Sequence, residues 1–175
     1  MRIHLRPIER DDLEWVILQR NNPVLYNNFN QPTPLTYEQQ LNWYENEVLT
    51  KKTFAYIILL DHIKIGYIAL QNINWVTRSA EISHFLDPEY DEIFALSAHI
   101  SMLRMAFDSL NLNRIHSICF EFNSIYKCLE ALGFKVEGTA RDICFKSGRY
   151  WNGYYIAILN KDFKREGEIG KNILA

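Results

Sequence analysis

The length, composition and charge of this 175-residue chain indicate an ordinary folded protein and exclude several kinds of function. Hydrophobic residues make up 48% of the chain and charged residues 23%, which is typical of one globular domain with a full core. The net charge of −2 provides no basic surface for nucleic acid. No apolar run reaches the roughly 20 residues of a membrane-spanning helix, so we expect no membrane partner. The first residues show no signal-peptide core, which places the protein in the cytoplasm.

The first third of the chain predicts one strand and several helices. Residues 3–7 alternate as a short strand that stops at Pro7. A helix then starts at Asp11 and Asp12, and the segment 19–23 breaks it before a possible short turn and a loop at 31–34. The spacing of Thr36 and Gln39 is that of a capping box, which predicts the next helix.

A β-hairpin and a further strand follow in the middle of the chain. Residues 54–60 and 63–70 are rich in β-forming side chains, and Asp61-His62 between them is a two-residue turn. Gly66 inside the second run suggests a bulge or a close backbone approach. Residues 79–86 predict the fourth strand.

A long helix over residues 92–110 connects this fourth strand to a fifth at 114–120. One apolar stripe predicts the helix, and its members are Ile93, Leu96, Ile100, Leu103, Phe107 and Leu110. A helix that follows a strand through a tight turn presents its unpaired N–H groups at the edge of the sheet, where they can hold an anion. The sequence therefore predicts a phosphate-type site at the start of this helix.

The last third predicts a short helix and a hairpin. Asn123 and Ser124 can cap the helix, and Gly133 is its natural left-handed stop. The hairpin pairs residues 134–145 with 150–159 and has apolar residues on both faces, which indicates a covered sheet or a homodimer interface. We expect a single domain over residues 1–163 and a C-terminal tail over 164–175.

The three cysteines predict free thiols. Cys119, Cys128 and Cys144 are odd in number, widely spaced and set among apolar residues. We therefore expect neither disulfides nor a metal site.

Six segments at matching spacing carry a family resemblance, and they cover nearly the whole chain. They lie at 20–23, 40–45, 80–82 with 86–90, 106–107 with 110–114, 129–138 and 148–150. In these segments the chain resembles the GNAT family of acyl-CoA-dependent N-acetyltransferases, above all its branch of ribosomal-protein N-terminal, spermidine and nucleotide-amino-sugar acetyltransferases. The resemblance implies an α/β (α+β) fold with a mixed, twisted sheet of about seven strands and four or so helices on its faces.

The resemblance also implies a reaction. Acetyl-CoA or a related acyl-CoA would be the co-substrate, and a primary amine would attack the acyl group directly. The acceptor would be a small molecule, such as an amino sugar or a polyamine, or a protein N-terminus.

One segment departs from the family pattern where the cofactor would bind. The family carries a glycine in the loop before the long helix, since glycine lets the backbone approach phosphate oxygens. Here Ile93 takes that place and only Ala95 matches, while Asp91 and Glu92 would repel a pyrophosphate. This leaves an alternative function, that of a GNAT-fold binding or interaction protein deficient in CoA binding.

The residues that the resemblance implies in cofactor binding act mostly through their backbone. They are Phe85, Leu86, Asp87, Ala95, Leu96, Ser97 and Asn123. The first three would contact the pantetheine arm at the end of the fourth strand, and an N–H there would polarise the thioester carbonyl. Asn123 would contact the pantetheine, although it is equally an ordinary helix cap.

The fourth strand also supplies the first candidate for general base. Strand alternation puts Glu81, Ser83 and Phe85 on one face, and the family often has Glu at the position of Glu81. A solvated strand carboxylate is the alternative. His84 lies on the opposite face and is a further catalytic candidate, since a histidine can titrate near neutrality, but a core or interface histidine is the more common reading.

The general acid of the family is a tyrosine that would protonate the departing CoA thiolate. Leu129 stands at that position here. Tyr126, one helical turn earlier, and Ser124, at the helix start, are the candidate substitutes. Tyr126 packed on the helix surface is the alternative.

An acceptor pocket that is both aromatic and polar can be drawn from several residues, although such residues are more often core or dimer contacts. The candidates are Asn21, Asn28, Tyr44, Trp75, Arg78, Tyr150 and Trp151.

Overall fold

The computed structural model describes residues 2–26, 28–29, 33–123 and 125–164. The chain forms two compact units, one of residues 1–73 and 81–102 and the other of residues 74–80 and 103–175. The single domain over residues 1–163 and the tail over 164–175 stay predictions. Ser124 and residues 165–175 lie outside the described residues.

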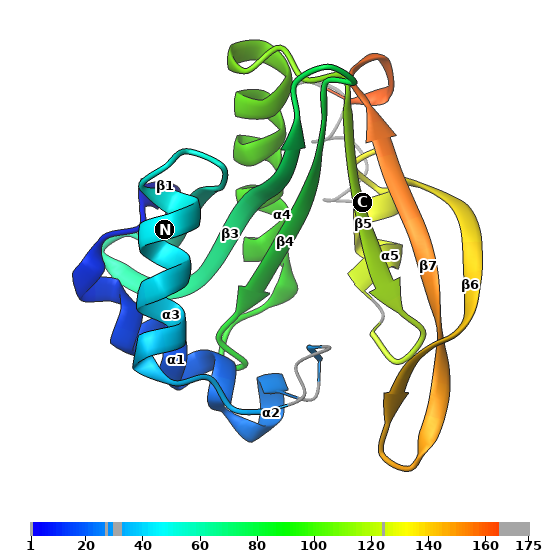
Figure 1. Ribbon diagram of the computed structural model, residues 1–175. Coiled ribbons are helices and arrows are strands. Elements are labelled where there is room, and N and C mark those ends of the chain that lie inside the picture. Colours follow the sequence, from blue (N-terminus) through cyan, green and yellow to red (C-terminus); the bar gives the residue numbers. More distant parts are fainter. Residues whose placement is uncertain (1, 27, 30–32, 124, 165–175) are drawn as a thin grey trace. The chain divides into compact units, whose positions relative to one another are not determined.

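The described residues form seven strands, and the first unit is built on four of them in the order β1-β2-β3-β4 (Figure 1). They are β1 (Ile3–Pro7), β2 (Phe54–Leu60), β3 (Ile63–Asn74) and β4 (Ser79–Leu86). Leu60 pairs with Ile63, which confirms the two-residue turn, and Asp61 in that turn has a φ of 55°. The third strand ends at Asn74 rather than at residue 70.

Gly66 combines both features predicted for it. The register between β2 and β3 shifts between Ile58 and Leu59, where Gly66 pairs. A Cβ at Gly66 would lie 2.6 Å from the carbonyl oxygen of Phe85. Because no other residue leaves that space, Gly66 lets β3 approach β4 closely.

Short helices cover one face of these strands. They are η1 (Arg10–Asp12), α1 (Leu13–Asn21), α2 (Pro23–Tyr26), α3 (Tyr37–Trp43) and the π-helical turn η2 (Tyr44–Val48). The predicted capping box is confirmed, since Thr36 accepts from the Gln39 N–H and Gln39 accepts from the Thr36 N–H. Their core includes Leu13, Val16, Ile57, Tyr67 and Phe85.

The long helix lies behind β3 and β4 in the view of Figure 1. It comprises α4 (Glu92–Arg104) and a π-helical turn, η3 (Met105–Ser109), which confirms the predicted helix. The predicted stripe is partly wrong, because Ile93 is 44% exposed. Ala95, Ala98, His99 and Met102 are buried instead, and the two small alanine side chains let the helix axis come near its neighbours.

Asp12 ties three elements of the first unit together. Its carboxylate is buried and accepts hydrogen bonds from Arg6 on β1 at 2.8 and 3.0 Å. Lys64 on β3 lies 2.7 Å away, and the Glu9 N–H donates to the same carboxylate at 2.8 Å. A buried charge is tolerated only with such partners.

The second unit contains the other three strands in the order β5-β7-β6. Its elements are β5 (Arg114–Phe120), α5 (Ile125–Glu130), β6 (Lys135–Lys146), β7 (Arg149–Leu159) and η4 (Asn160–Asp162). Both strand pairs are antiparallel, and Ser147 and Gly148 form the turn of the predicted final hairpin with φ of 53° and 78°. Gly133 ends α5 at a φ of 105°, as predicted.

The free thiols are confirmed, with Cys119 and Cys144 buried and Cys128 half-buried. Within the described ranges, no group of acidic, histidine or cysteine side chains could hold a metal ion. The helices of the same ranges are all too short or too polar to cross a membrane. The cytoplasmic location stays a prediction.

Candidate active site

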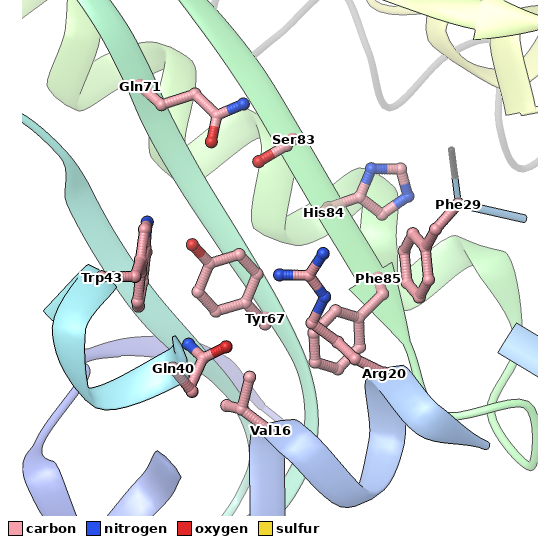
Figure 2. Close-up of a pocket in the computed structure, with 10 residues that line it drawn as sticks. All are labelled: Val16, Arg20, Phe29, Gln40, Trp43, Tyr67, Gln71, Ser83, His84 and Phe85. Carbon is pink, nitrogen blue, oxygen red and sulfur yellow. The ribbon is translucent and has the colours of Figure 1, made fainter. Parts of the chain in front are cut away.

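A cavity of about 180 Å³ lies in the first unit, beside β3 and β4 (Figure 2). It is lined by Val16 and Arg20 from α1, Phe29, Gln40 and Trp43 from α3, Tyr67 and Gln71 from β3, and Ser83, His84 and Phe85 from β4. Because α1 and α3 pack over one face of the strands, side chains from distant parts of the sequence converge there.

Aromatic rings form the walls of this pocket. Tyr67 and Phe85 are stacked with centroids 5.4 Å apart, and Trp43 meets Tyr67 edge-on at 6.2 Å. Phe29 meets Phe85 edge-on at 6.1 Å. Offset and edge-on contacts of this kind stabilise the rings against one another.

The Arg20 guanidinium lies among these rings (Figure 2), with its central carbon 5.4 Å from the centroid of Phe29. Burial lowers the pKa of Arg20, and the neighbouring Tyr67 opposes that effect. Burial likewise raises the pKa of Tyr67, which Arg20 partly offsets. At neutral pH the pair is therefore a cation beside a neutral phenol.

Glu81 lies on the same face of β4 as two lining residues. Ser83 and Phe85 line the pocket, and alternation puts Glu81 two residues further along that face, about 7 Å from Ser83 between Cα atoms. Asn72 donates a hydrogen bond of 2.7 Å to the Glu81 carboxylate. Asn72 has a φ of 52°, a conformation that asparagine tolerates better than most residues.

His84 contacts the helix on the other face of β4. Its ring meets that of His99 of α4 edge-on at 4.6 Å, and His99 Nδ1 lies 2.8 Å from the Ala95 carbonyl oxygen. Burial and the neighbouring His99 lower the pKa of His84 well below its usual range. Burial lowers the pKa of His99 to about 4. Both rings are neutral at pH 7, and His84 is half-buried where it lines the pocket, so its catalytic role stays a prediction.

The end of β4 presents its backbone groups to alternate sides. The Asp87 N–H donates to the Ile65 carbonyl of β3 at 2.8 Å. In an antiparallel pair, adjacent residues of a strand point their N–H and C=O groups to opposite sides. The N–H and C=O of Leu86, the residue before Asp87, therefore face away from β3. Of the three residues predicted to contact the pantetheine through their backbone, Leu86 is the one whose N–H and C=O face away from β3.

The start of α4 carries its own carboxylate cap. Asp91 accepts a hydrogen bond from the Ile93 N–H at 2.9 Å, and the Phe94 N–H bonds to the Asp91 carbonyl at 3.0 Å. Ala95 is fully buried, and the Ser97 hydroxyl donates to the Ile93 carbonyl. The unpaired N–H groups of a helix belong to its first residues. The N–H groups of α4 that could bind an anion therefore come before the predicted residues Ala95, Leu96 and Ser97.

Two candidates of the second unit lie at α5. Asn123 accepts a hydrogen bond from the Ile125 N–H at 3.1 Å, which confirms its role as a helix cap. The Tyr126 ring lies 5.0 Å from that of Tyr154 on β7. The catalytic role of Tyr126 and the pantetheine contact of Asn123 stay predictions.

The acceptor residues drawn from the sequence are not those that line the pocket. Asn21 instead fixes the chain, since its side chain bonds to both the N–H and the carbonyl of Leu35. Arg20, its neighbour in the quoted segment 20–23, enters the pocket. Gln40 and Trp43, which also line it, lie in segment 40–45, so the resemblance is the signal that could have found them, although the sequence analysis did not select them.

Comparison with protein families gives one match that covers most of the chain. The model of the acetyltransferase (GNAT) domain matches residues 2–135. The matched residues include the first unit except Met1, and the β5 strand of the second unit.

Individual relatives agree with this match. The spermidine N(1)-acetyltransferase of Escherichia coli K12 is 30% identical over 171 residues, which cover 94% of this chain and 89% of that protein. A putative ribosomal N-acetyltransferase of Bacillus subtilis, YdaF, is 29% identical over 62% of this chain and 61% of its own length. The structure of spermidine N-acetyltransferase from Vibrio cholerae in complex with CoA and spermine has a TM-score of 0.85 at 24% identity, covering 91% of this chain and 96% of that chain.

Proposed function

The chain belongs to the acetyltransferase (GNAT) domain family, and from this premise we propose that acetyl-CoA is its co-substrate and that Glu81, beside the pocket, deprotonates the acceptor amine. The fold prediction is confirmed, since the mixed seven-stranded sheet with its helices is the GNAT fold of the structural neighbours. The prediction of an N-acetyltransferase, rather than a protein that has lost this activity, agrees with the relatives.

One observation carries the proposed site. Glu81 shares its face of β4 with Ser83 and Phe85, which line the pocket. An amine bound beside Ser83 lies within reach of the Glu81 carboxylate through one water molecule. Asn72 holds that carboxylate in place by its hydrogen bond of 2.7 Å.

The Leu86 N–H is the proposed donor to the thioester carbonyl. It faces away from β3, because its neighbour Asp87 pairs with Ile65. A fixed N–H stabilises the negative charge that develops on the carbonyl oxygen as the amine attacks. The cofactor supplies the activated acyl group, and the Leu86 backbone orients it.

The start of α4 is a poor site for the pyrophosphate, because carboxylates lie there. Asp91 already caps the helix, and Glu92 lies beside it. We propose that the pyrophosphate binds near this helix start in spite of the carboxylates, with reduced affinity. We propose that Tyr126 or Ser124 delivers the proton to the thiolate. The homodimer also remains a proposal, and the exposed side chains of Phe145, Tyr150 and Tyr155 would form its interface.

Release of free thiol from acetyl-CoA tests this function directly. The protein should release thiol only when a primary amine is present, and the acetylated amine should be found by mass spectrometry. The panel should contain a polyamine, amino sugars and peptides with free N-termini, because each is an acceptor within the proposed class. Thiol release that does not depend on any amine would count against amine acetylation.

A further inference from the structure

The acceptor pocket carries one basic side chain and no carboxylate among the described residues that line it. The base is Arg20 of α1, and the other polar lining groups are the Tyr67 hydroxyl, Gln40, Gln71 and Ser83. His84 adds no charge, since burial and His99 keep it neutral at pH 7. The described lining is therefore electropositive.

The charge of Arg20 persists inside the pocket. A guanidinium stays protonated at neutral pH even where burial lowers its pKa. Aromatic walls of Phe29, Tyr67 and Phe85 surround it, and they contribute no full negative charge. In such surroundings the field of a charge is stronger than in water.

Uncharged amides and a hydroxyl complete the lining. Within the described part of the chain, the side chains of Gln40, Gln71 and Ser83 make no hydrogen bond. Figure 2 shows the Gln71 amide of β3 and the Ser83 hydroxyl of β4 among the groups that line the pocket. These groups can bind hydroxyl or amide groups of an acceptor without favouring a positive charge.

We propose that the acceptor carries an anionic group, a carboxylate or a phosphate, beside its primary amine, and that Arg20 binds this group. The proposal rests on the proposed function, since it concerns the acceptor of the same reaction. The planar guanidinium matches both oxyanions with two parallel hydrogen bonds. A polyamine carries only positive charges and would be repelled by Arg20.

The positions of the groups agree with such an acceptor. Arg20 approaches the pocket from α1, whereas Ser83 and Glu81 follow each other along β4. An acceptor with its anion at α1 and its amine toward Glu81 satisfies both ends. The opposite orientation would place the anion toward the Glu81 carboxylate and is disfavoured.

Calorimetric binding to the full chain, without acetyl-CoA, tests the inference separately from catalysis. Two pairs of probes differ only in the anion: glucosamine 6-phosphate with glucosamine, and serine with serinamide. Spermidine is the polycationic probe. The variants are Arg20→Gln, Arg20→Lys, and Arg10→Gln as a matched control, since Arg10 is exposed and pairs with Glu45 at 3.8 Å.

The anionic member of at least one pair should bind roughly 10- to 100-fold more tightly, which is the range of a charge-assisted hydrogen-bond pair. Arg20→Gln should reduce this preference below about threefold, Arg20→Lys should keep part of it, and Arg10→Gln should keep all of it. The pair that shows the preference identifies the anion as phosphate or carboxylate.

Three results would overturn the inference: no anionic probe binds, the preference survives Arg20→Gln, or spermidine binds most tightly. If Arg20→Gln fails to fold in a thermal melt, Gln40→Glu replaces it, because a new carboxylate in the pocket should abolish the preference with Arg20 intact. Thiol release with acetyl-CoA is measured in parallel. An anion preference without acetyl transfer would reject the proposed function alone, and transfer without the preference would reject this inference alone.

Discussion

Replacing Asp91 by Asn should raise the affinity for CoA, because it removes a charge and keeps the helix cap. The Asp91 carboxylate accepts the Ile93 N–H at 2.9 Å, and the amide oxygen of asparagine can accept the same bond. We take a separation of about 6 Å between the phosphate and the carboxylate, since each would lie about 3 Å from the N–H groups of this turn. Two unit charges at that distance repel by about 0.7 kcal/mol in water and about 2.8 kcal/mol at an effective dielectric near 20.

These limits correspond to a gain of about 3- to 100-fold in affinity, measured by calorimetric titration of the variant with acetyl-CoA. The gain should shrink as salt is added, since screening already weakens the repulsion in the parent. Asp11→Asn is the matched control, because Asp11 is an exposed aspartate of the same unit that belongs to η1 and not to the start of α4. An unchanged affinity in a folded Asp91→Asn protein would refute the reasoning and show that the pyrophosphate does not approach this helix start.

Three further predictions concern catalysis and stability. Glu81→Gln should lower the rate of acetyl transfer about 10²- to 10⁴-fold at pH 7, with a smaller loss at high pH where the amine is already neutral; a loss below about threefold at every pH would remove Glu81 from the mechanism. Asp12→Asn should lower the free energy of unfolding by about 1–3 kcal/mol at pH 7, because Arg6 and Lys64 lose their common partner. Burial acts to raise the pKa of Asp12, but hydrogen bonds from Arg6, Lys64 and the Glu9 N–H lower it below 3.8. The extra stability of the parent over Asp12→Asn is therefore complete above pH 3.8 and is lost as the pH falls through the folded pKa. Equal free energies of unfolding for parent and variant in denaturant at pH 7 would contradict this prediction. Gly133→Ala should destabilise the fold by about 1–3 kcal/mol, because Gly133 has a φ of 105° and a Cβ there would lie 2.7 Å from the Asp162 carbonyl oxygen. Gly138→Ala is the control: a Cβ at Gly138 has no atom within 4 Å, so the melting temperature should stay unchanged.

Local patterns predicted the elements well because the forces that set them are local. The capping box of Thr36 and Gln39 and the turn at Asp61 follow from residues that are neighbours in the sequence. The buried face of α4 did not follow from the apolar stripe, since burial of Ala95 and Ala98 depends on how closely the helix approaches its neighbours. A small residue carries no signal of its own for such an approach.

The pocket was harder to predict because it is made by long-range packing. Strand alternation predicted that Glu81, Ser83 and Phe85 share a face, and Ser83 and Phe85 line the cavity. Periodicity could not show that Arg20 of α1 would meet Tyr67 of β3, which is 47 residues away (67 − 20). Which residues face each other across packed elements is a property of the tertiary structure.

Two contacts at the end of β4 bear on both the proposed acceptor side and the proposed acyl side of the site. The bond between the Asp87 N–H and the Ile65 carbonyl fixes the register of β4, and a slip of one residue would exchange its two faces. The Asp87 carboxylate also accepts a hydrogen bond of 3.0 Å from Gln19 of α1, the residue before Arg20. Asp87 therefore takes part in two contacts: its N–H pairs with β3 beside Leu86, the proposed donor to the thioester, and its carboxylate holds the helix that carries Arg20. From the proposed function we expect that a change at Gln19 alters both the Michaelis constant for the amine and the turnover rate.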